Sequence, residues 1–126
     1  MAERVLITGG AGFIGSALGA HLVEKGYELW VLDDLSFGKR ALAPVPDERF
    51  LRVDIRDRAE VFAAIARCAP DQVLHLAAIH FIPYCNQHPV EAADINITGT
   101  INVLDAAASV TRVQPVSYTH LRFNAG

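Results

Sequence analysis

The sequence predicts an α/β protein with a doubly wound parallel sheet, and three observations support this prediction. Short runs rich in β-forming residues alternate with segments of helical periodicity along the chain. A glycine-rich string lies between the first such run and the first helical segment. The run at 72–76 is almost continuously apolar, as strands buried on both faces are. Crossovers in such a sheet are right-handed, and ligands bind outside the carboxyl ends of its strands.

The strands are expected where β-forming residues cluster. The five runs are residues 4–8, 28–32, 50–53, 72–76 and 112–116. Pro115 fits poorly inside a central strand, because proline cannot donate to the hydrogen-bond ladder.

Three helices are expected between these strands. The first starts at about Phe13, and its apolar stripe consists of Ile14, Leu18, Leu22 and Val23. The second lies between a cap at Asp57 and Pro70, and its inner face consists of Val61, Phe62 and Ile65. The third runs from about Val90 to Ala108, and its apolar positions are Ile95, Ile97, Ile101, Leu104 and Ala108.

The string Thr8-Gly9-Gly10-Ala11-Gly12-Phe13-Ile14-Gly15 indicates a dinucleotide site. It fits G-x-G-x-x-G, and Gly9, Gly12 and Gly15 also have the spacing of a G-x-x-G-x-x-G variant. Glycine at 12 lets a pyrophosphate approach the backbone, and glycine at 15 lets the helix pack closely on the strand. The N–H groups of Phe13 and Ile14 are expected to point at the phosphate. A purely structural glycine turn is the alternative interpretation.

Asp33 strengthens the dinucleotide interpretation. It ends the second apolar run and follows Gly15 at about the 20-residue spacing typical of a ribose-binding carboxylate. A carboxylate there accepts hydrogen bonds from two ribose hydroxyls and repels a 2′-phosphate, which favours NAD over NADP. Lys39 and Arg40 are the opposing observation, since a folded-back loop would bring cations to such a phosphate.

The loop expected from Ala77 to Pro89 is long and holds histidines and aromatic residues, which is typical of a site. His80, Cys85 and His88 match no common zinc spacing, so no metal site is expected. His75, at the end of an apolar strand, is expected to be a hydrogen-bonded core residue.

Composition narrows the class of protein. The chain has 126 residues and a net charge of −3, which gives no support to nucleic-acid or membrane-surface binding. It shows neither a secretory leader pattern nor an apolar run long enough to span a membrane, so a cytoplasmic protein is expected. Cys68 and Cys85 are expected to be free thiols.

Several motifs in the same order resemble those of the extended short-chain dehydrogenases. The resemblance is to the NAD-dependent epimerase/dehydratase family typified by UDP-glucose 4-epimerase, and it covers about residues 3–113. The motifs are the glycine string, Asp33-Asp34-Leu35-Ser36, Asp54-Ile55, His75-Leu76-Ala77-Ala78 and Asn96-x-x-Gly99-Thr100. The resemblance implies a Rossmann-type fold and NAD as the cofactor.

The resemblance also implies roles for single residues. Asp33 would hold the adenosine ribose, and Asp54 and Ile55 would meet the adenine. Ala77 and Ala78 would line the nicotinamide half of the cofactor. Asn96 would brace the site from its helix, and His80 stands where these enzymes commonly carry a lysine that touches the nicotinamide ribose.

The chain departs from the family pattern at its end. The family's hydride transfer needs a Tyr-x-x-x-Lys pair, and this sequence contains none; Tyr118 is followed four residues on by Arg122. Arginine is a poor substitute, because its guanidinium holds its donors in a rigid fork. Thr119 is the nearest counterpart of the family's catalytic Ser/Thr. The expected domains are an NAD-binding part at 1–113 and a tail at 114–126 that resembles translated adapter sequence, so the sheet is expected to be truncated after about strand five.

The resemblance implies a parent enzyme that oxidises a hydroxyl of a nucleotide sugar and returns the hydride, giving epimerisation, dehydration or reduction, and it allows a homodimer. This chain by itself is expected to bind NAD without turning over substrate. A non-catalytic dinucleotide sensor is the alternative function, and a fragment that does not fold stably is a third interpretation.

Overall fold

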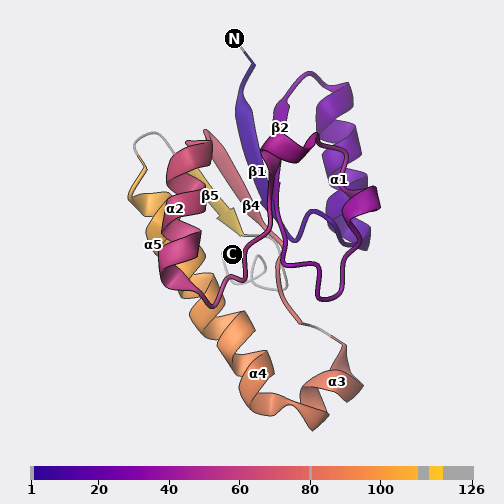
Figure 1. Ribbon diagram of the computed structural model, residues 1–126, viewed down its shortest axis with the longest axis vertical. Coiled ribbons are helices and arrows are strands. Elements are labelled where there is room, and N and C mark those ends of the chain that lie inside the picture. The colour runs from indigo at the N-terminus through magenta and orange to yellow at the C-terminus, as the bar shows by residue number, and fades with distance from the viewer. Residues whose placement is uncertain (1, 80, 111–113, 118–126) are drawn as a thin grey trace, which may run out of the picture.

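The structure is a computed structural model that describes residues 2–79, 81–110 and 114–117 (Figure 1). One parallel sheet has the strand order β3-β2-β1-β4-β5. The strands are β1 (Arg4–Thr8), β2 (Glu28–Leu32), β3 (Phe50–Leu51), β4 (Gln72–His75) and β5 (Gln114–Ser117). The helices are α1 (Phe13–Glu24), α2 (Arg58–Cys68), α3 (Ile82–Gln87), α4 (Pro89–Ala93) and α5 (Thr100–Ala108), with a π-helix (Asp94–Gly99) joining α4 to α5. The predicted fold class is therefore confirmed.

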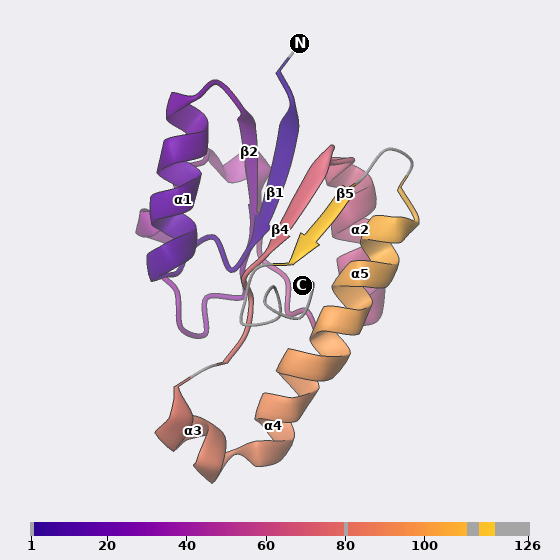
Figure 2. The same ribbon diagram turned by 180° about the vertical axis from the view of Figure 1, so that it is seen from behind.

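Helices cover both faces of the sheet. Figures 1 and 2, which view the molecule from opposite sides, show α1 on one face and α2 with α5 on the other. Successive β1 residues accordingly face opposite cores, with Val5 and Ile7 buried toward α1 and Leu6 buried toward α2 and α5. Burial on both faces explains why β1 and β4 are so uniformly apolar.

The strand order reverses direction between β1 and β4. Chain order runs outward from β1 through β2 to β3 on one side, and then continues with β4 and β5 on the other. Thr8 and His75, the last residues of β1 and β4, pair directly. Such a reversal leaves a crevice at the carboxyl ends of the strands, because the connections leave toward opposite faces.

The stripe predicted for α1 is only half right. Leu18 and Leu22 pack on the sheet, but Ile14 is 66% exposed and Val23 is also exposed. The helix instead turns its buried Gly15 and Gly19 toward the sheet. These glycines allow an approach so close that a Cβ on residue 19 would lie 2.9 Å from the Leu29 side chain. The two glycines, which have no side chain, therefore determine which face of α1 packs against the sheet.

The second helix forms as predicted. The Asp57 side chain caps α2 by accepting a hydrogen bond from the backbone N–H of Glu60 at 3.2 Å. Val61 and Ile65 are fully buried. The helix ends at Ala69, whose left-handed φ of 45° closes it before Pro70.

Three other predicted elements differ from the structure. The loop expected from Ala77 to Pro89 contains a short helix, α3, which tolerates Pro83 because proline lacks only an N–H that the first turn leaves unpaired. The strand expected over 50–53 pairs only at residues 50–51. The last predicted strand, over 112–116, is described from residue 114 and extends to 117, while 112 and 113 lie outside the described residues; the described sheet has this strand at an edge, where Pro115 is acceptable. Within the described residues, no helix is both long and apolar enough to cross a membrane.

Candidate functional site

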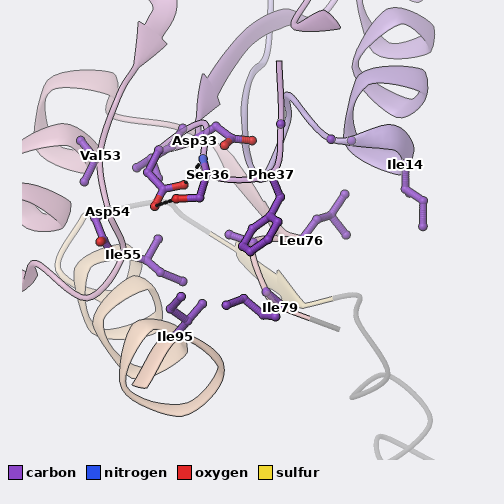
Figure 3. A pocket seen from close by; sticks show the side chains of 18 of the residues that line it. Ile14, Asp33, Ser36, Phe37, Val53, Asp54, Ile55, Leu76, Ile79 and Ile95 are labelled. Carbon is purple, nitrogen blue, oxygen red and sulfur yellow. Dashed lines mark hydrogen bonds between the residues drawn. The ribbon is translucent and has the colours of Figure 1, made fainter. Parts of the chain in front are cut away.

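A cavity of about 720 Å³ lies at the carboxyl ends of β1, β2 and β4 (Figure 3). Segments far apart in the sequence line it: the glycine turn after β1, the loop 32–38, residues 53–55, residues 76–79, and Ile95. It thus lies at the strand-order reversal, where the sequence predicts a ligand.

The glycines of the turn have different structural duties. Gly9 has a φ of +76°, and a Cβ there would lie 2.8 Å from the backbone nitrogen of Ala77. A Cβ on Gly15 would lie 2.3 Å from the carbonyl oxygen of Gly9. A Cβ on Gly12, by contrast, would meet only that same oxygen at an ordinary 3.4 Å. The fold itself therefore requires glycine at 9 and 15, whereas Gly12 leaves room on the cavity side.

The first turn of α1 opens toward this cavity. Gly12 is the N-cap residue, and its carbonyl accepts the hydrogen bond from the N–H of Ser16 at 2.9 Å. The N–H groups of the first turn have no partner within a helix, and the helix dipole makes this end electropositive. Phe13 and Ile14 border the cavity and are 90% and 66% exposed, so neither side chain is buried against this end of the helix. The geometry suits an anionic group.

Asp33 lies at the end of β2 beside the glycine turn. Its carboxylate accepts hydrogen bonds from the N–H of Ala11 at 3.0 Å and from the N–H of Leu35 at 2.8 Å. Burial raises the pKa of Asp33, and the two backbone donors partly oppose this shift. The carboxylate therefore has a fixed orientation, and it holds the glycine turn and the loop after β2 together. The sequence pattern gave no sign of this second, structural duty.

Asp54 and Ile55 border the cavity on the β3 side. Arg56 forms a fork to the Asp54 carboxylate, with its Nε 3.0 Å from Oδ1 and its terminal nitrogen 2.5 Å from Oδ2. The hydrogen bond from Arg56 is the main cause that lowers the pKa of Asp54. Ile55 is buried, and its carbonyl accepts a hydrogen bond from the Asn102 side chain at 2.9 Å. Figure 3 shows Val53, Ile55 and Ile95 forming an apolar wall here.

Asn96 contacts a residue of the cavity lining but does not line the cavity itself. It lies on the π-helix, and its side-chain amide donates to the carbonyl of Ile79 at 2.7 Å while its oxygen accepts from the N–H of Ile79 at 2.8 Å. Asn96 does not belong to the lining, whereas Ala77, Ala78 and Ile79 do. The observed contact of Asn96 is thus with the lining segment.

Sequence reasoning missed several lining residues. Phe37 lies over the cavity, and its ring meets that of Tyr84 edge to face at 5.2 Å. Ser36, from the same loop, also lines the cavity, and Ile79 and Ile95 complete its apolar wall. The turn-forming composition of 34–40 signals a loop, but nothing in it indicates that Phe37 turns back over the crevice.

Two predicted site residues, His80 and Thr119, lie outside the described residues. The described parts of the chain hold no group of three or more His, Cys, Asp or Glu side chains that could bind a metal ion.

Comparisons with known proteins agree with this geometry. The model of the NAD-dependent epimerase/dehydratase family matches residues 5–120. A UDP-glucose 4-epimerase of Klebsiella pneumoniae is 33% identical over 109 residues, which cover 82% of this chain and 78% of that protein. A dTDP-glucose 4,6-dehydratase of Neisseria meningitidis is 36% identical over 119 residues, or 90% of this chain and 34% of that protein.

A solved structure shares the fold over most of the chain. The UDP-glucose 4-epimerase of Thermus thermophilus, crystallised in complex with NAD, superposes with a TM-score of 0.82 at 39% identity. The match covers 89% of this chain and 36% of that one. The chain thus spans about a third of the length of most relatives named here. The family match extends past residue 113, and the domain boundary placed there remains a prediction.

Proposed function

Because the chain belongs to the NAD-dependent epimerase/dehydratase family, we propose that its cavity binds NAD and that the whole protein transfers hydride at a hydroxyl of a nucleotide sugar. The observation that carries the proposal is the opening at Gly12, beside the fixed carboxylate of Asp33. The first gives a diphosphate access to the N-terminus of α1, and the second lies where the adjoining ribose would be.

The cavity fits a dinucleotide in size and in chemistry. Its volume lies within the range of roughly 300–1,000 Å³ that is usual for small-molecule sites. The apolar wall of Val53, Ile55 and Ile95 would receive the adenine, and Ala77 with Ala78 would adjoin the nicotinamide half. Asp33 favours NAD over NADP, because a 2′-phosphate beside its carboxylate meets like charge.

When bound, NAD supplies the hydride acceptor, and the residues of this chain bind and orient it. Thr119 is proposed as the counterpart of the catalytic Ser/Thr. Because the sequence holds no Tyr-x-x-x-Lys pair, we expect this chain by itself to bind NAD without turning over a nucleotide sugar. The second candidate function is a non-catalytic dinucleotide sensor, and the gene sequence past residue 126 distinguishes the two, because an in-frame Tyr-x-x-x-Lys pair there favours the enzyme.

The whole protein is proposed to be a homodimer that pairs through the outer face of the helix from α4 to α5. Val90 is 79% exposed and Ile97 is 61% exposed on this face, and Ile101 and Leu104 are exposed as well. Residues 97, 101 and 104 have the spacing of a helix-packing seam, and a shallow apolar hollow lies beside Val90 and Ile97. Across a two-fold axis, the seam of one copy would meet the hollow of the other. Analytical ultracentrifugation tests this pairing: the wild-type protein is expected to sediment as a dimer and the Ile101→Lys variant as a monomer.

Isothermal titration calorimetry with NAD and with NADP tests the coenzyme assignment. Wild-type protein is expected to bind NAD more tightly than NADP. Asp33→Asn keeps the shape of the side chain but removes its charge, and should weaken NAD binding by about tenfold or more, the loss expected for a hydrogen bond to a charged group. Glu24→Gln, at the exposed C-terminal end of α1, removes one charge away from the cavity; it is the matched control and should leave the affinity for NAD unchanged. Folded protein that gives no heat with either coenzyme would refute the assignment.

A further inference from the structure

His75 is a buried polar side chain that the proposed function does not use. It is 2% exposed at the end of β4, and both of its ring nitrogens have partners. Nδ1 lies 2.6 Å from Thr8 Oγ1, and Nε2 lies 2.9 Å from Thr100 Oγ1. The His75 ring therefore links β1 to α5 at the carboxyl ends of the strands.

The surrounding hydrogen bonds determine where the protons of this bridge lie. The hydroxyl of Thr100 donates to the carbonyl of Asn96 at 2.8 Å, so it has no second proton to give to the imidazole. His75 must then donate from Nε2 to Thr100 Oγ1. In a neutral ring Nδ1 is left as the acceptor, and it takes the proton of the Thr8 hydroxyl.

The contacts of Thr8 fit this assignment. Its Oγ1 accepts from the N–H of Leu76 at 3.1 Å and from the N–H of Ala77 at 3.2 Å, which leaves its own proton free to donate. A second proton on His75 would face an oxygen whose lone pairs are already engaged. Burial lowers the pKa of His75 to about 4, so the ring is neutral at pH 7.

Both ends of the bridge connect through hydrogen bonds to residues 77–79, which line the cavity. One end of it reaches the N–H of Ala77 through Thr8. The other end reaches Asn96 through Thr100, and the Asn96 side chain holds both backbone groups of Ile79. Ala77 and Ile79 are thus anchored from opposite directions, by β1 and by the π-helix, and both anchors meet at His75.

We propose that His75 and Thr100 are positioning residues. The neutral His75 ring, protonated at Nε2, links the two anchors, and these place residues 77–79 against the coenzyme. The coenzyme part of this inference rests on the proposed function. Neither side chain belongs to the cavity lining, so both act through Thr8 and Asn96.

Nitrogen NMR of the histidine rings tests the proton assignment without any coenzyme. At pH 7 the His75 signals, assigned through bonds from the backbone of the wild-type protein, should show a protonated Nε2 and an unprotonated Nδ1. The opposite form, or a doubly protonated ring, would overturn the proposal. The measurement is made on wild-type protein, so it does not depend on whether a variant folds.

A matched pair at position 100 tests the positioning role. Thr100→Val replaces the hydroxyl by a methyl group of similar size, and Thr100→Ser keeps the hydroxyl. We expect faster amide exchange at Ile79 in the valine variant and NAD binding weakened by about tenfold, with the serine variant near wild type. Equal exchange rates and affinities in the two variants would overturn the positioning role. A wild-type protein that binds no NAD while showing the expected ring protonation and exchange would refute the proposed function alone.

Discussion

Alanine substitutions at Gly15 and Gly12 should separate the glycine that the fold needs from the glycine that the ligand needs. The two residues lie in the same turn and look alike in the motif. A Cβ at 15 would lie 2.3 Å from the Gly9 carbonyl oxygen and 2.8 Å from Gly10 Cα, both rigid backbone atoms. A Cβ at 12 would have only one neighbour, at 3.4 Å.

The expected stabilities follow from these contacts. At position 15 the helix must shift away from the turn, at a cost of about 3 kcal/mol or more, and the better helix propensity of alanine offsets about 1 kcal/mol of that. Gly15→Ala should therefore lower the free energy of unfolding by about 2 kcal/mol or more. Residue 12 has an extended conformation open to any residue (φ −86°, ψ −176°), so Gly12→Ala should change stability by less than about 1 kcal/mol.

Binding should show the reverse pattern. The methyl group of Gly12→Ala would occupy the approach to the first turn of α1, so NAD affinity should fall by about tenfold or more in a protein that remains folded. Urea denaturation followed by circular dichroism gives the stabilities, and calorimetry gives the affinities. Wild-type stability in Gly15→Ala would refute the contact reasoning, and wild-type affinity in Gly12→Ala would refute the assigned route for the diphosphate.

Three further predictions concern stability and are checked by urea denaturation. Asn102→Ala should cost about 1–3 kcal/mol, because the buried Asn102 amide donates to the carbonyl of Ile55, which would lose that partner; an unchanged midpoint would contradict this. Burial raises the pKa of Cys68 to about 12 from an ordinary 9.0, so the unfolded thiol ionises first, and stability should fall as pH rises between these values; Cys68→Ala should remove about 2 kcal/mol of that decline at about pH 10.5, and an identical pH profile would argue against it. Gly26→Ala places a side chain at a φ of +92° with nothing within 4 Å, so strain alone should cost about 1–2 kcal/mol, and a stabilised variant would exclude that strain.

Much of the candidate site could be predicted from local sequence patterns. The glycine string and Asp33 could be predicted because a strand, a tight turn and a helix are neighbours in the chain, and each imposes its own residue type. The rule that parallel strands present their carboxyl ends at one edge then brought Asp54 and Ala77 to the same place. Both lie in the cavity lining, although the role of each toward a coenzyme remains a prediction.

Other features of the site depend on contacts between distant segments. Periodicity indicated that Ile14 and Leu18 share a helix, but the close packing of Gly15 and Gly19 decided that Ile14 faces outward. Phe37 lines the cavity because its loop packs against Tyr84, which is remote in sequence.

The amino-acid sequence by itself determined the class of fold, the turn that suits a phosphate and the acid beside it, because those depend on backbone sterics and on spacing within single elements. Only the tertiary structure decided that Thr8, His75 and Thr100 form one hydrogen-bonded bridge, since its members come from β1, β4 and α5. A hydrogen bond requires atoms to come within about 3 Å of one another. No pattern along a chain specifies that distance between elements that meet only after the sheet has formed.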